Sequence, residues 1–97
     1  LSCILHLQET EKGGNLSIYN KRWKKKLEKY REIEFGYNSN IKKKSLSDTI
    51  ETKLGDLVII NPNYLHEVKE IQGISDRVTL GMFFGIENKT KKIFFWA

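Results

Sequence analysis

The stretch KLGDLVIINPNYLHEVKEIQGISDRVTLGMFF, residues 53–84, decides the fold because it predicts apolar strands separated by well-marked turns. Gly55 and Asp56 indicate a turn before the apolar run LVII, and the sequence NPN at 61–63 indicates a second turn. His66 therefore lies just past a turn, where a strand is entered. This order of turn, strand, turn and histidine is typical of the half of a β-barrel that carries a site.

A third turn, GISD at 73–76, precedes another predicted strand. Side chains alternate between the two faces of a strand, so Arg77 and Thr79 should share one face with Gly81 and Phe83. The opposite face would carry the apolar residues Val78, Leu80, Met82 and Phe84.

The run GDLVIINPNYLHEV followed by RVT resembles the C-terminal half of the Fe(II)/2-oxoglutarate-dependent oxygenases, which include prolyl-hydroxylase-like hydroxylases and small-molecule halogenases. GGNLSIYN at 13–20 and the closing IFFWA at 93–97 resemble further segments of that family. The resemblance spans residues 1–97 and implies the C-terminal part of a single oxygenase domain. The expected fold is all-β with one short helical insert, a double-stranded β-helix or jelly roll.

The same resemblance implies a role for three residues. His66 would be one imidazole ligand of a non-haem Fe(II), which needs two imidazoles and usually a carboxylate. Arg77 would hold the far carboxylate of the cosubstrate 2-oxoglutarate with its planar, permanently charged fork, beside the hydroxyl of Thr79. Molecular oxygen and a small-molecule or amino-acid or peptide substrate would be the remaining partners.

Each of these residues also has a structural interpretation. His66 could be an ordinary solvent-facing histidine, Arg77 a surface ion-pair partner of Asp76 or Glu87, and Thr79 a good strand former. Under that interpretation the chain is a non-catalytic, cupin-like jelly-roll module for binding or interaction.

The chain begins at Leu1, within the strand-like run LSCILHLQ, and contains neither a His-x-Asp nor a His-x-Gly/Ala motif. In the resembled family this first metal motif decides between hydroxylation, the default expectation, and halogenation, in which chloride replaces the carboxylate ligand. His6 is rejected as the missing ligand, because the family usually has an aromatic residue there. We therefore expect a piece truncated at its N-terminus, inactive alone and left with exposed strand edges.

The remaining elements follow from local patterns. ETEKGGN at 9–15 predicts the turn of a hairpin that pairs residues 16–19 back on residues 1–8, with Gly13 and Gly14 as hairpin glycines. Residues 20–34 predict one or two helical turns, with the aromatic side chains of Trp23 and Tyr30 docking the insert. Strands are also expected at 47–53 and 92–96.

The net charge of +5 and a pI near 9.4 come mainly from lysine, without a recognised nucleic-acid-binding motif, so nucleic acid is an unlikely partner. The sequence has no membrane-spanning run. Cys3 is the single cysteine, and we expect a buried core residue rather than a nucleophile. One unpaired cysteine is compatible with a cytoplasmic protein. The sequence does not define an oligomeric state.

Overall fold

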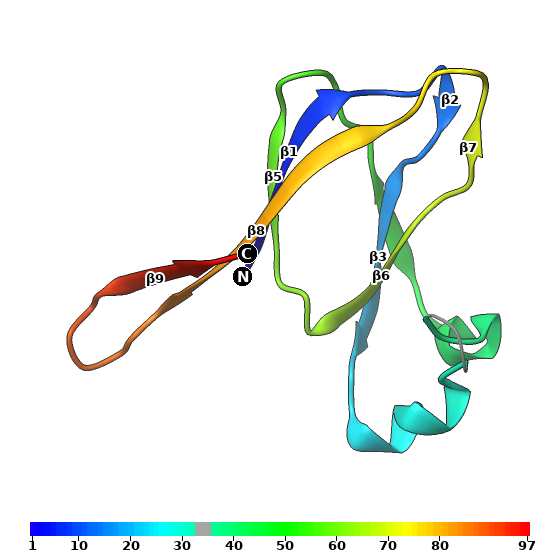
Figure 1. Cartoon of the computed structure of the whole chain (residues 1–97). Coiled ribbons are helices and arrows are strands. Elements are labelled where there is room, and N and C mark those ends of the chain that lie inside the picture. Colours follow the sequence, from blue (N-terminus) through cyan, green and yellow to red (C-terminus); the bar gives the residue numbers. More distant parts are fainter. Residues whose placement is uncertain (33–35) are drawn as a thin grey trace.

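The computed structural model describes residues 1–32 and 36–97, and its secondary structure is dominated by antiparallel strands (Figure 1). The larger sheet has the order β5-β1-β8-β9, formed by Leu57–Ile60, Ser2–Gln8, Val78–Ile86 and Ile93–Trp96. The smaller sheet has the order β4-β3-β6, formed by Ser47–Ile50, Leu16–Arg22 and Tyr64–Val68. Two short strands, β2 (Lys12–Gly13) and β7 (Ile71–Gln72), pair with each other. Two 3₁₀ helices, η1 (Lys25–Tyr30) and η2 (Ser39–Lys42), form the insert.

The chain alternates between the two sheets. It leaves β1 in the larger sheet for β3 and β4 in the smaller one, returns to β5, crosses to β6, and returns again to β8. Because successive segments are placed on opposite sheets, their turns fall at the two ends of a flattened barrel. The predicted all-β, jelly-roll-like fold is confirmed.

Exposure identifies the interior face of the larger sheet. Ile60 and His6 are 5% and 1% exposed, and the register places His6 directly opposite Thr79. The other face is open, since Leu57 and Leu80 are more than half exposed. Thr79, opposite the buried His6, therefore points into the barrel interior.

Cys3 is buried, as expected, but it lies on the open face of the larger sheet, between Ile59 and Met82 in the register. Leu5 lies on the same face of β1, opposite Leu57 and Leu80, so this open face also carries apolar side chains.

On the smaller sheet the interior face carries Leu16, which is buried, and Ile18, which pairs with His66. The opposite face carries Tyr19 and Glu67, against which the insert packs. His66 thus belongs to the interior face, on the strand at one edge of this sheet.

The predicted pairing of residues 16–19 with residues 1–8 is wrong. β3 pairs with β4 and β6, while both sides of β1 are taken by β5 and β8. The two glycines of the expected hairpin instead allow close contact with another segment. A Cβ on Gly13 would lie 1.9 Å from the carbonyl oxygen of Glu70, so only glycine lets β2 approach β7 so closely.

The insert also differs from its prediction. β3 continues to Arg22, whose guanidinium lies 5.3 Å from the centre of the Tyr64 ring, and helical structure begins only at Lys25. Leu27 and Ile41 are the buried anchors of the insert, whereas Trp23 is 44% exposed. Residues 33–34, the end of the predicted helical range, lie outside the described residues.

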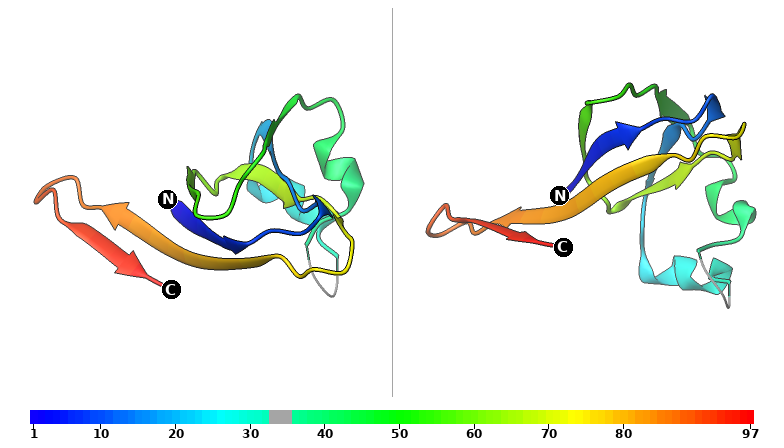
Figure 2. Two further views of the ribbon diagram at one scale, coloured as in Figure 1. Left: turned by 90° about the horizontal axis from the view of Figure 1, so that it is seen from above. Right: turned by 45° about the horizontal axis from the view of Figure 1, so that its top comes forward.

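The last hairpin, made by the end of β8 and by β9, extends away from the two sheets in every view (Figure 2). Its aromatic rings contact one another, Phe83 with Trp96 and Phe84 with Phe95. The predicted closing strand is confirmed as β9, and all four of its side chains are exposed.

Candidate functional site

His66 is oriented by a hydrogen bond to its own strand. Its Nδ1 lies 2.8 Å from the backbone carbonyl oxygen of Tyr64. A carbonyl oxygen can only accept, so Nδ1 carries the hydrogen and the lone pair of the neutral ring is on Nε2. Histidines that bind metals are commonly held in this way, with one nitrogen donating to a carbonyl and the other left for the metal. His66 is exposed, and its Nε2 is the nitrogen that could bind a metal ion.

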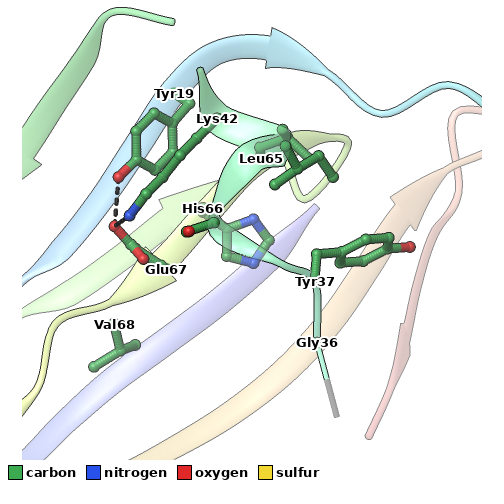
Figure 3. Close-up of a pocket in the computed structure, with 10 residues that line it drawn as sticks. Tyr19, Gly36, Tyr37, Lys42, Leu65, His66, Glu67 and Val68 are labelled. Atoms are coloured by element: carbon green, nitrogen blue, oxygen red, sulfur yellow. Dashed lines mark hydrogen bonds and ion pairs between the residues drawn. The ribbon is translucent and has the colours of Figure 1, made fainter. Parts of the chain in front are cut away.

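A cavity of about 580 Å³ opens beside His66 (Figure 3). Its wall comes from β3, β6, the end of the insert and the 36–37 segment, and includes Tyr19, Gly36, Tyr37, Ile41, Lys42 and Val68. This volume is within the range of small-molecule sites. Gly36 and Tyr37 therefore border this cavity together with His66.

Tyr37 is fixed in place by a polar network of the insert. Its hydroxyl accepts from Trp23 Nε1 at 3.1 Å and Arg31 Nη2 at 3.0 Å, and donates to Glu28 Oε1 at 2.7 Å. Hydrogen bonds from Arg31 and then from Tyr37 lower the pKa of Glu28 to about 2. All bonding positions of the hydroxyl are therefore used within the insert, while the residue still borders the cavity.

A second polar cluster joins the insert to the outer face of β6. The Glu67 carboxylate accepts from Lys42 at 2.8 Å, from Lys69 at 2.5 Å and from the Tyr19 hydroxyl. These hydrogen bonds, that from Lys42 first, lower the pKa of Glu67 to about 2. Glu67 follows His66 directly in β6, so this cluster holds in place the strand that carries His66 (Figure 3).

Arg77 lies immediately before β8, with its stem packed on Gly14. A Cβ on Gly14 would be 2.9 Å from Arg77 Cδ, so the buried glycine makes room for the arginine. Nε of Arg77 is buried and has no hydrogen-bond partner among the described residues. No ion pair with Asp76 or Glu87 occurs in the described part of the chain, which contradicts the surface ion-pair interpretation.

One residue of the interior was considered in the sequence only as a metal ligand and then rejected. His6 is the most buried ionisable side chain among those described, with Nδ1 2.5 Å from Glu9 Oε1. The same carboxylate oxygen accepts from Thr52 Oγ1 at 3.2 Å, whereas His6 Nε2 is buried without a partner. The available signal was a histidine between two leucines of a strand-like run, since buried polar groups normally have a function or a partner.

These residues fit Fe(II) and 2-oxoglutarate only in part. Nε2 of His66 is a suitable ligand atom, and the guanidinium of Arg77, whose Nε is buried without a partner among the described residues, suits an anion. However, no cluster of three or more His, Cys, Asp or Glu side chains occurs in residues 1–32 and 36–97. This chain would therefore contribute one ligand, and a facial metal site needs two more.

The comparison with family models decides the classification. The model described as carrier-protein-independent halogenase WelO5 matches residues 1–97. The chain belongs to the WelO5 halogenase family. This membership confirms the predicted relationship to the Fe(II)/2-oxoglutarate oxygenases and supports an iron- and 2-oxoglutarate-dependent enzyme of the halogenase type. It does not support the expectation that hydroxylation is the default reaction. No curated protein matches the chain.

The all-β, jelly-roll-like fold is consistent with this family membership. In the described residues, no helix has the length and apolar character needed to cross a membrane.

Proposed function

We propose that this chain is the C-terminal part of an oxygenase domain that uses Fe(II), 2-oxoglutarate and molecular oxygen to halogenate a C–H bond of a small molecule. The observation that carries the proposal is the buried Nε of Arg77 without a partner, beside Thr79 on the strand face that points into the barrel. A buried donor without an acceptor costs about 1–3 kcal/mol, which a bound carboxylate would remove.

In this proposal each residue has a distinct task. His66 binds the metal through Nε2, and the Tyr64 carbonyl keeps its ring in the correct tautomer and orientation. Arg77 and the Thr79 hydroxyl bind the far carboxylate of 2-oxoglutarate. When bound, the metal supplies the oxidising chemistry that activates an unactivated C–H bond.

Halogenation is preferred over hydroxylation because of the WelO5 family match. In the resembled oxygenases, a small residue in place of the carboxylate ligand leaves a position for chloride. The 97 residues contain no His-x-Asp or His-x-Gly/Ala motif, so the deciding residue would come from outside this sequence.

The family description, carrier-protein-independent halogenase, suggests a substrate that is free in solution. The cavity beside His66 supports this view, because its volume of about 580 Å³ suits a small molecule and its wall combines aromatic and aliphatic side chains. Tyr37 is the residue of that wall that we expect to contact substrate.

The test uses His66→Ala in the full-length protein. We expect the variant to lose most of its bound iron and the turnover of 2-oxoglutarate, because one of few ligands is removed. Asn61→Ala, a change in the preceding turn that leaves the imidazole intact, serves as the matched control. Unchanged iron content and turnover in His66→Ala would refute the role of His66 and favour the non-catalytic module. Mass spectrometry of products formed with chloride and with bromide would separate halogenation from hydroxylation.

A further inference from the structure

A concavity lined by cations lies where β3 ends and the insert begins. Its volume is about 400 Å³, and its described wall holds four cationic side chains, Lys21, Arg22, Lys24 and Lys26, and no acidic one. None of the four forms an ion pair with an acidic residue in the described part of the chain. Like charges repel one another, so this arrangement is costly unless an anion lies among them.

Backbone contacts fix the shape of this concavity. Arg22 is the last residue of β3 and pairs in the register with Tyr64, the first residue of β6. The N–H of Trp23 donates to the carbonyl oxygen of Asn63 at 2.7 Å, which holds the end of β3 on the turn before β6. Leu27 of η1 also belongs to the wall and is 4% exposed. The cationic side chains therefore extend from a frame held by hydrogen bonds and packing.

Two of the cations are oriented by contacts of their own. The guanidinium of Arg22 lies over the Tyr64 ring, 5.3 Å from its centre. A guanidinium over an aromatic face keeps its N–H groups at the edge of its plane, where they can donate to an anion. Nζ of Lys21 donates to the carbonyl oxygen of Ile41 at 2.6 Å. An ammonium has three donors, so two of them remain for a ligand.

The charge and size of the concavity indicate the class of ligand. A phosphate group on an organic molecule carries a charge of about −1.5 to −2 near pH 7, so two neighbouring phosphates match four cations. Lys24 and Lys26 are exposed, which makes their ammonium groups accessible from solution. The volume of about 400 Å³ lies in the range of small-molecule sites, whereas single-stranded nucleic acid needs a basic groove that follows its backbone.

This concavity is separate from the site described above. β3 has seven residues, and a rise of about 3.3 Å per residue places its two ends about 20 Å apart. Arg77 packs on Gly14, just before β3 begins, whereas the four cations lie at the end of β3 and beyond it. The two ends can be followed in Figure 1, with β2 and β7 near the start of β3 and the insert after its end.

We propose that this concavity binds a small molecule that carries two neighbouring phosphate groups. Arg22 holds one phosphate with its planar fork, and the three lysines neutralise the remaining charge. The inference goes beyond the proposed function and does not depend on the roles given to His66 and Arg77.

The test is a calorimetric titration of pyrophosphate into the full-length protein at physiological ionic strength. Fe(II) and 2-oxoglutarate are kept bound under anaerobic conditions, so that the metal and cosubstrate positions are not open to the probe. The Debye length is then about 8 Å, so charges farther away than this contribute little. We expect saturable binding of pyrophosphate that is tighter than the binding of inorganic phosphate.

Two double variants distinguish the concavity from the general surface charge. Lys24→Gln with Lys26→Gln removes two of the four lining charges and should weaken pyrophosphate binding about tenfold to hundredfold. The matched control is Lys25→Gln with Lys43→Gln, which removes the same net charge from exposed lysines that do not line the concavity. It should change the affinity by less than about twofold.

Arg22→Lys keeps the charge but loses the planar fork, and it should also weaken pyrophosphate binding. Lys21 is left unchanged, because its hydrogen bond to Ile41 joins β3 to the insert. Thermal melting identifies variants that fold, and all the replaced side chains are exposed.

Three results would overturn the inference. The first is the absence of saturable pyrophosphate binding to the wild type. The second is equal weakening by the two double variants, which would show that only the overall surface charge attracts the probe. The third is tighter binding of a short single-stranded oligonucleotide that both double variants weaken equally, which would indicate an extended nucleic-acid surface instead.

Discussion

Replacing Arg77 by lysine should weaken 2-oxoglutarate binding while keeping the positive charge. Nε of Arg77 is the atom shielded from water without a partner, and it lies along the stem that packs on Gly14. Lysine has no donor at that position and presents a single ammonium instead of a planar fork. The loss should be that of about one charge-assisted hydrogen bond, roughly 1.5–3 kcal/mol. This corresponds to about a tenfold to hundredfold higher dissociation constant.

Anaerobic titration of 2-oxoglutarate into the Fe(II)-loaded full-length protein measures this change directly. Thr79→Val should cost less, on the order of 1 kcal/mol, because it removes one neutral hydroxyl and preserves shape. Arg31→Lys is the matched control, since it makes the same replacement at an arginine that is 60% exposed and paired with Glu28. Equal affinity of the wild type and Arg77→Lys would refute the reasoning and remove the main support for the cosubstrate site.

Three further predictions test the surroundings of the site. Gly14→Ala should lower the free energy of unfolding by about 1–2 kcal/mol through its positive φ and should also weaken 2-oxoglutarate binding, because the new Cβ displaces Arg77. Gly55→Ala, where φ is also positive but nothing lies near the Cβ, should show only the stability loss in thermal melts. The Glu67 pKa of about 2, below its ordinary 4.5, means that its pairing stabilises the fold above pH 4.5 and is lost as pH falls towards 2. Denaturant titrations at several pH values should therefore show that acid lowers the free energy of unfolding less in Glu67→Gln than in the wild type, by about 1 kcal/mol after solvent screening. The same pH dependence of the free energy of unfolding in both proteins would contradict the role given to Glu67. The 97-residue chain alone should self-associate through its exposed strand edges and apolar hairpin, and a monomer in sedimentation would argue against this.

Local sequence determined where most strands begin and end. Gly55, Pro62 and Gly73 lie in or beside turns that the structure contains, because the conformational limits of glycine and proline act within a few residues. Alternation along the strand likewise predicted which residues of β8 share a face with Thr79, although not that this face is the interior one. The site residues taken from the family resemblance rest on the same short-range pattern, and their roles remain predictions.

Tertiary structure alone decided which strands pair and which faces are buried. The partner of β3 depends on segments more than 25 residues away, so a nearby glycine pair could not identify it. β1 has apolar residues on both faces, Cys3 and Leu5 on one and Ile4 on the other, and its own sequence cannot indicate which face meets the smaller sheet. Packing of the two sheets made the face with His6 the interior one. This is why a histidine that the sequence reasoning set aside became the most buried ionisable side chain among the described residues.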